Sequence, residues 1–165
     1  FGGSTSFRRE PQKPHYSLPL SFEEAALGIS KTIVHQGKQH TLKVPAGADD
    51  GTRIRYPDFD VSFDVRPHSQ FKREGYDLFL DLDLPFTTAA LGGDILVPLL
   101  GERKPLKIKI RPGTEGNTMI RLTGKGIKYL QSNRHGDYYI RLHLQVPQKL
   151  TKKQKDLLKE LHQTL

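Results

Sequence analysis

The sequence predicts a mainly β fold made of two tandem small β-sandwich-like domains, each with a short helix, and a further helix at the C-terminus. Three observations predict it: an internal repeat, alternating apolar residues typical of strands, and a helical pattern confined to the last residues. With 11 prolines and 15 glycines among 165 residues, and 35% hydrophobic residues, the composition favours many turns over one large core.

The internal repeat consists of two blocks that recur in the same order. Residues 20–28 (LSFEEAALG) recur as 84–92 (LPFTTAALG), and residues 47–55 (GADDGTRIR) recur as 113–121 (GTEGNTMIR). Matching Gly, Thr, Ile and Arg positions in both blocks indicate a duplicated unit rather than chance similarity.

Each copy contains the same predicted elements. An alternating segment has the period of two of a half-buried strand, and the Phe-x-x-Ala-Ala-Leu-Gly block predicts one or two helical turns closed by a left-handed glycine C-cap. A hairpin and a short Thr-x-Ile-Arg strand follow. The first strand and the two hairpin strands are expected at 16–20, 31–35 and 41–44 in the first copy, and at 78–84, 94–98 and 106–110 in the second.

Polar stretches containing proline and glycine divide the chain. The expected parts are a flexible linker remnant at 1–15, a first domain at 16–67, a hinge at 68–76, a second domain at 77–148 and a terminal helix at 149–165. Phe71 lies in the polar hinge, where a large aromatic side chain has no evident core to enter.

The terminal helix has an apolar stripe with two possible partners. Thr151 and Gln154 form a capping-box pattern, and a helix of this length is marginal alone in water. The stripe therefore packs either on its own domain or on a second chain. It consists of Leu157, Leu158, Leu161 and Leu165.

Residue types that carry chemistry are present but poorly arranged for it. His35 and His40 flank a tight turn without a third metal ligand, and the acidic pairs at 58–60 and 81–83 are typical of a solvated sheet face. The segment 124–126 lacks the remainder of a phosphate-binding loop. There is no cysteine. The sequence therefore predicts no enzyme, no metal and no cofactor.

With no enzyme or metal site predicted, a binding function is the class of function that the sequence favours. The net charge of +8 is spread along the chain, which permits weak DNA binding but lacks the concentrated basic element of a dedicated nucleic-acid binder. No apolar run is long enough to span a membrane. Tyr16 and Leu18 share a strand face, and Ile33 lies on a strand expected to neighbour it. These residues form either a closed core or an open patch that takes an extended peptide by strand addition.

Several motifs resemble the C-terminal region of the DnaJ/Hsp40 co-chaperones, in the order found in that family. They lie at 21–28, 44–54, 67–78, 89–93, 97–98, 121–126 and 134–138, within a likeness that covers 16–165. The chain has no His-Pro-Asp of a J-domain and no Cys-x-x-Cys of the zinc-binding subclass. A short segment at 55–59 replaces a longer glycine-rich loop and leaves the strand after it in doubt.

The resemblance implies a cytoplasmic, bacterial, homodimeric co-chaperone that binds unfolded client proteins and delivers them to a DnaK-type Hsp70. It implies a dimerisation role for the four leucines of the terminal stripe, and Lys31 is the basic residue that matches a contact to the acidic Hsp70 tail. A nucleoid-type DNA-binding relative is the alternative. The implied client groove comprises Tyr16, Leu18, Ile33, His35 and Phe71, with His35 replacing a usual aliphatic residue.

Overall fold

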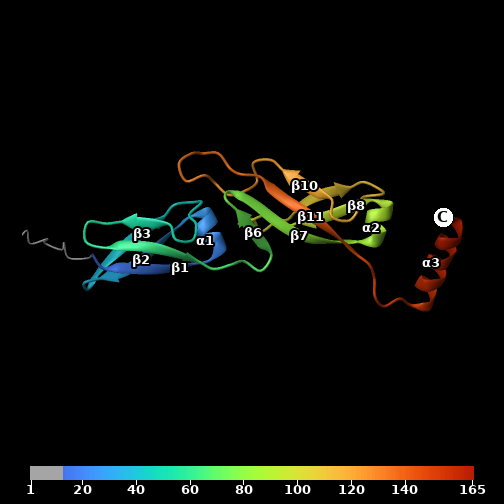
Figure 1. Ribbon diagram of the computed structural model, residues 1–165, viewed down its shortest axis with the longest axis horizontal. Helices are drawn as coiled ribbons and strands as arrows, with labels where there is room; N and C mark the ends of the chain where they lie inside the picture. Colours follow the sequence, from blue (N-terminus) through green and yellow to red (C-terminus); the bar gives the residue numbers. More distant parts are fainter. Residues whose placement is uncertain (1–12) are drawn as a thin grey trace, which may run out of the picture.

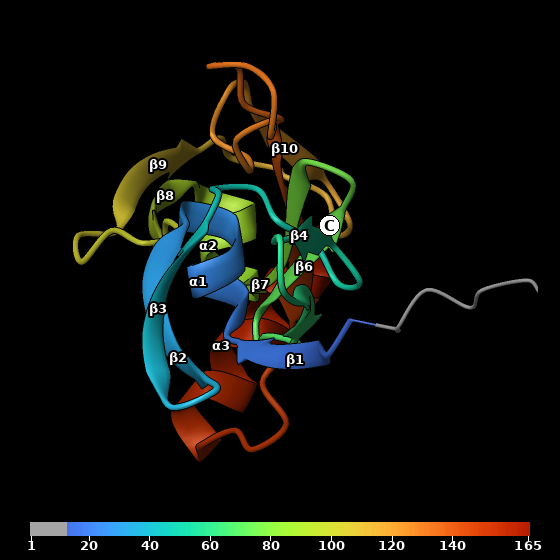
Figure 2. The same cartoon turned by 90° about the vertical axis from the view of Figure 1, so that its left-hand side faces the viewer.

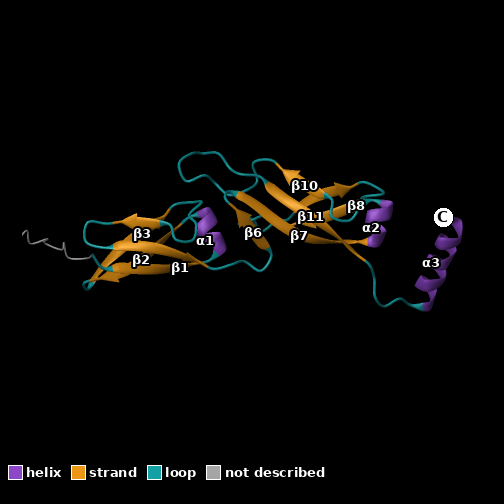
Figure 3. Ribbon diagram, in the orientation of Figure 1, coloured by secondary structure: helices purple, strands orange, loops and turns teal. Residues whose placement is uncertain are grey.

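The computed structural model describes residues 13–165. Two β-rich units follow one another along the long axis, and a terminal helix lies beyond the second unit (Figure 1). Strands make up most of both units, and the short helices lie at their ends (Figure 3). The predicted fold class, mainly β with two sandwich-like repeats, is confirmed.

The first unit consists of a three-stranded sheet and a separate hairpin. The sheet has the order β1-β5-β4, with β1 parallel to β5, and β2 pairs only with β3 in the antiparallel hairpin. Figure 2 looks onto this unit, with α1 beside the hairpin. The elements are β1 (His15–Leu20), α1 (Phe22–Leu27), β2 (Ile29–His35), β3 (Lys38–Val44), β4 (Arg53–Arg55) and β5 (Asp60–Val65).

The second unit repeats this arrangement and adds one strand. Its sheet has the order β10-β11-β7-β6, and β8 pairs with β9 in the hairpin. Strands β7 and β11 are parallel, as β1 and β5 are. The elements are β6 (Phe71–Glu74), β7 (Asp77–Pro85), α2 (Phe86–Leu91), β8 (Gly93–Val97), β9 (Leu106–Ile110), β10 (Met119–Leu122) and β11 (Tyr138–Gln145).

The short helices form where the repeat predicts them. In α1 the Ser21 hydroxyl accepts a hydrogen bond from the Glu24 N–H, and the Glu24 carboxylate accepts one from the Ser21 N–H. Gly28 and Gly92 end the helices with φ of 80° and 78°. Their ψ values of 147° and 176° are extended, so the predicted left-handed C-cap is wrong, although glycine is still required by the positive φ.

The predicted hinge at 68–76 is wrong, because part of this segment forms strand β6. Residues Phe71–Glu74 pair antiparallel with β7, and Phe71 faces Leu80 in the register. Because this pairing gives Phe71 a place in the second core, a stretch that is polar by composition is a strand rather than a hinge. The strand left in doubt after the short 55–59 segment does form, as β5, and it pairs with both β1 and β4.

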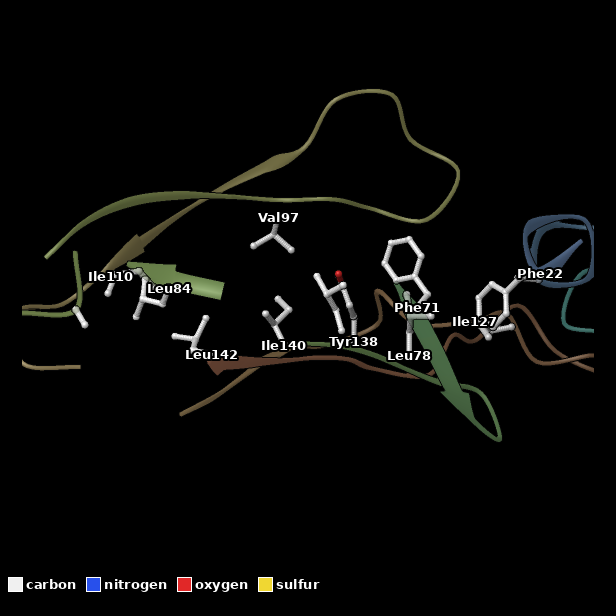
Figure 4. Packing of buried hydrophobic residues seen from close by; sticks show 13 residues of the cluster. Phe22, Phe71, Leu78, Leu84, Val97, Ile110, Ile127, Tyr138, Ile140 and Leu142 are labelled. Carbon is white, nitrogen blue, oxygen red and sulfur yellow. The ribbon is translucent and has the colours of Figure 1, made fainter. Parts of the chain in front are cut away.

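The two units contact each other through packed residues. Phe22 and Ala26 of α1 belong to the second unit's hydrophobic cluster, and Figure 4 shows Phe22 beside Ile127. The Arg73 guanidinium of β6 donates a 2.7 Å hydrogen bond to the carbonyl of Ala48. The first unit's own cluster comprises Leu20, Ala25, Leu42, Val44, Ala48, Phe59, Val61 and Phe63.

Helix α3 (Lys152–Thr164) begins at the predicted capping box. The Thr151 hydroxyl accepts from the Gln154 N–H, and the Gln154 side chain accepts from the Thr151 N–H. No residue of α3 is buried within the described chain. None of the helices found in residues 13–165 combines the length and apolar character needed to cross a membrane.

Candidate peptide-binding groove

The first unit has two neighbouring strands, β1 and β2, that do not pair with each other. Each has a single strand partner, β5 for β1 and β3 for β2. Side chains connect them: Tyr16 of β1 hydrogen-bonds His35 of β2, and the Lys31 ammonium of β2 donates to the carbonyl of Pro19 in β1. The backbone groups on one edge of each strand are therefore not used in the ladders of this unit.

Three predicted groove residues lie together along these strands. Tyr16 and Leu18 of β1 and Ile33 of β2 are all partly buried and pack against the first unit's hydrophobic cluster. They alternate with exposed residues such as Ser17 and Thr32, as the pleat of a strand requires. The sequence thus identified Tyr16 and Leu18 on one face of β1 and Ile33 on β2, and all three side chains retain an accessible part.

His35 differs from its predicted place in the groove. It is only 3% exposed and packs against Phe59, with ring centroids 4.7 Å apart. Its Nδ1 lies 2.8 Å from the Tyr16 hydroxyl, whereas its Nε2 has no hydrogen-bond partner among residues 13–165. His35 therefore supports Tyr16 from below and presents no surface to a peptide.

Removing the Tyr16 hydroxyl should destabilise the first unit. In a Tyr16→Phe variant both ring nitrogens of buried His35 would lack a partner, and a buried unsatisfied polar group costs about 1–3 kcal/mol. Urea unfolding should show this loss, whereas Tyr56→Phe, which removes a hydroxyl from the same aromatic cluster, should change stability by less than about 0.5 kcal/mol. Equal stability of the two variants would contradict the role of the Tyr16–His35 bond.

Phe71 is not part of the groove. It is 6% exposed and packs in the second unit, with its ring 6.0 Å from that of Tyr138. The repeat explains this position: β7 corresponds to β1, and β6 pairs with the edge of β7 that corresponds to the free edge of β1. The second unit covers with its own strand the edge that the first unit leaves open.

Lys31 lies at the α1 end of the groove and is already paired. Its ammonium is 2.8 Å from a carboxylate oxygen of Glu24 and donates to Pro19 at 3.1 Å. The hydrogen bond from Lys31, followed by that from the Ser21 backbone, lowers the pKa of Glu24, so its carboxylate stays ionised. A cavity of about 280 Å³ opens here, lined by Pro19, Leu20, Ser21, Glu24, Lys31 and Arg66.

The other candidate chemical groups are not arranged as a metal site or as an acid–base pair in the described part of the chain. His35 and His40 do meet across the hairpin, with ring centroids 5.9 Å apart, but no cluster of three potential metal ligands occurs in the described part of the chain. Asp81 contacts Lys72 and His143, each at 3.2 Å. Hydrogen bonds from Lys72 and then His143 lower the pKa of Asp81, which does not suit it to donate a proton.

A polar clamp joins two sequence motifs that the chain keeps apart. The Asp137 carboxylate accepts a 2.8 Å hydrogen bond from the Gly124 N–H and pairs with Arg121 at 2.6 Å. These contacts, that of Gly124 first, lower the pKa of Asp137. These contacts show that the glycine-rich 124–126 segment is a structural turn. The sequence gave no signal that Asp137 would contact Gly124 and Arg121.

The apolar stripe of α3 is open in the single chain. Leu157 is 56% exposed, Leu161 is 45% exposed and Leu165 is 96% exposed, whereas Leu158 is partly buried. The stripe therefore does not pack on its own unit. This rules out the first of the two interpretations of the sequence and leaves packing on a second chain. Its other side carries lysines, which gives the helix one apolar and one charged face.

The fold and this groove define a tandem β-sandwich repeat whose first copy has an open strand edge. A family model described as "DnaJ C terminal domain" matches residues 14–147. The chain therefore belongs to the DnaJ C-terminal domain family, as its motifs predicted.

Curated relatives agree with this assignment. The chain is 41% identical over 145 residues to proteins named "Chaperone protein DnaJ" from Burkholderia pseudomallei (strains 1710b and K96243) and from Burkholderia mallei (strain SAVP1). The match covers 80% of this chain and 38% of each relative, so the chain spans well under half of their length.

Proposed function

We propose that this chain is the substrate-binding region of an Hsp70 co-chaperone and binds extended apolar segments of unfolded proteins in the β1–β2 groove. One observation carries the proposal: two neighbouring strands have unpaired edges, and partly buried Tyr16, Leu18 and Ile33 lie along them. The relatives are named as chaperone proteins, which favours the same function.

Strand addition explains how such a groove accepts many sequences. Backbone N–H and C=O groups of a client pair with a free strand edge whatever the client's side chains are. Alternate client side chains then point toward the groove, where Leu18 and Ile33 offer apolar contacts. Affinity then comes from the client's backbone hydrogen bonds, and selectivity comes from every second client side chain, which must be apolar.

A comparison of the two units favours the first unit as the binding site. In the second unit β6 covers the corresponding edge of β7, and Phe71 fills the space over Tyr138. A client would have to displace a strand of the chain itself before it could pair there. We therefore expect one groove per chain.

Transfer to Hsp70 and dimerisation complete the proposal. An acidic Hsp70 tail that reaches Lys31 must share this ammonium with Glu24, which limits its affinity at that position. The exposed leucines of α3 are proposed to pack against a second copy of the chain, so that a dimer presents two grooves. Two linked grooves raise the avidity for a long unfolded chain without any new contact.

Polar substitution of the groove floor tests client binding. A Leu18→Ser, Ile33→Ser variant should bind a fluorescent extended apolar peptide at least about tenfold more weakly, because two lost apolar contacts together exceed about 1.4 kcal/mol. Suppression of aggregation of a denatured protein should fall in parallel. Fluorescence anisotropy and light scattering measure the two effects.

Val34→Ser with Leu96→Ser is the matched control. Both residues are large, apolar and more than 60% exposed on hairpin strands, and neither packs against the groove. The control should bind as the unmodified chain does, and circular dichroism should show that both double variants are folded. Unchanged peptide binding by a folded Leu18→Ser, Ile33→Ser variant would refute the groove.

A further inference from the structure

A second concave surface lies between the two units, outside the proposed groove. It is a cavity of about 730 Å³, formed by residues 27–30 and 43–46 of the first unit and residues 128–133 of the second. This volume is within the range of ligand pockets, about 300–1,000 Å³. In the β2–β3 register Ile29 pairs with the buried Val44, and Ser30 pairs with the exposed Lys43. All four residues line the cavity, so this inter-unit cleft lies across the end of the hairpin next to α1 and includes residues from both of its faces.

Four exposed apolar side chains line the cleft. Leu27 is 52% exposed, Ile29 37%, Tyr129 39% and Leu130 40%, and all four line the cavity. Leu27 also lines a smaller neighbouring cavity of about 150 Å³. Exposed apolar residues that gather in a concave site indicate a binding surface more strongly than scattered ones do.

The charges around the cleft all have one sign. Lys43 and Lys128 line the larger cavity, and Lys125, Lys128 and His135 line the smaller one, with no Asp or Glu among the described lining residues of either. None of these three lysines has an ion-pair partner within residues 13–165. Lys31 in the groove is different, because Glu24 already neutralises it.

The walls of the cleft are held in place by packing. Tyr129 stacks on Tyr76 with ring centroids 4.2 Å apart, and a β-bridge between Lys128 and His135 closes the loop that forms the second wall. The Cα of Gly47 approaches the Lys128 backbone so closely that a Cβ would overlap its carbonyl oxygen. The two walls therefore belong to one packed inter-unit contact.

We propose that the inter-unit cleft binds an acidic peptide segment that carries an apolar side chain. The apolar side chain lies beside Leu27 and Leu130, and carboxylates on either side of it pair with Lys43 and Lys128. An apolar floor with so few cations suits such a peptide better than a nucleic acid, whose binding relies on many phosphate contacts and stacked bases.

The test uses a fluorescein-labelled pentapeptide with a central leucine and two glutamates on each side. Lys43→Glu with Lys128→Glu should weaken its binding at least tenfold by anisotropy, and Leu27→Ser should weaken it about threefold or more. The matched control is Lys38→Glu with Lys109→Glu, which makes the same charge change at exposed strand residues outside both cavities and should keep most of the affinity.

Two further arms separate this site from the groove and from a simple charge effect. The Leu18→Ser, Ile33→Ser variant should still bind the acidic peptide, so failure of the groove leaves this proposal intact. When the acidic peptide is added to unmodified protein, the amide chemical shifts of Ile29, Lys43 and Leu130 should change. This measurement does not depend on the folding of any variant.

Three results would overturn the proposal. These are equal weakening by the two lysine-to-glutamate pairs, equal binding of a peptide whose leucine is replaced by serine, and shifts confined to the β1–β2 groove. A DNA duplex that binds the cleft more tightly than the peptide, and loses binding with Lys43→Glu and Lys128→Glu, would assign the cleft to nucleic acid instead.

Discussion

Replacing Leu157 and Leu161 by alanine is expected to convert a dimer of this chain into monomers. Both leucines are about half exposed on α3 in the single chain, and each dimer would bury two copies of both. Burying a half-exposed leucine contributes roughly 0.75 kcal/mol or more, about half of the value for a fully exposed one, so the four substitutions should raise the dimer dissociation constant at least about a hundredfold. Sedimentation velocity over a concentration series measures the change.

Alanine at Lys155 and Lys159 is the matched control for this effect. These residues lie on the opposite side of the same helix and are exposed. Alanine has a high helix propensity, so neither double variant should unfold α3. The lysine variant should sediment as the unmodified chain does, whereas an unmodified chain that is monomeric at high concentration, or a leucine variant that remains dimeric, would contradict dimerisation through α3.

Alanine at Gly47 is expected to disrupt the contact between the two units. Gly47 has a φ of +88°, and a Cβ at this position would overlap the carbonyl oxygen of Lys128 in the second unit. A left-handed φ costs a non-glycine residue roughly 1–2 kcal/mol, and overpacking against a rigid backbone adds about 1–3 kcal/mol. The backbone of Lys128 cannot rotate away as a flexible side chain could.

The repeat supplies the control for this substitution. Gly113 occupies the same position of the second copy, with a φ of +76°, and nothing lies within 4 Å of its would-be Cβ. The N–H groups of both glycines donate to the preceding helix, to Ala25 from Gly47 and to Ala89 from Gly113. Gly113→Ala therefore carries the cost of φ without the steric overlap.

Thermal and urea unfolding should separate the two glycine variants. We expect Gly47→Ala to be at least about 1 kcal/mol less stable than Gly113→Ala, which corresponds to a Tm difference of about 2–4 °C for a chain of this size. Gly47→Ala should also weaken acidic peptide binding in the inter-unit cleft. Equal stability of the two variants would show that the units do not pack at Gly47 in solution.

The local elements were predictable because their causes are local. The capping boxes at Ser21 and Thr151, the glycines after both short helices and the period-two strands all act within a few residues of sequence. The duplicated blocks also predicted two copies of one unit. The left-handed C-cap was wrong because ψ at Gly28 depends on how the chain enters β2, which pairs with β3.

The sequence predicted part of the arrangement around the candidate groove. Tyr16 and Leu18 are two residues apart on one strand, so their shared face follows from the pleat, and Ile33 alternates with the exposed Thr32 and Val34. Burial of His35 depends on Phe59, which follows the β2–β3 hairpin in the chain and is far from His35 in the sequence. Phe71 was misplaced because a polar neighbourhood in sequence gives no information on the strand that pairs with it.

By itself the sequence determined the repeat, the order of strand, short helix, hairpin and strand within each copy, the terminal amphipathic helix and the family. Only the tertiary structure decided which strand edge is open, that Lys31 is neutralised by Glu24, and that unpaired lysines gather around apolar residues between the units. The physical reason is range: propensity and capping act between near neighbours, whereas edge pairing, charge compensation and cleft formation depend on residues that only folding brings together.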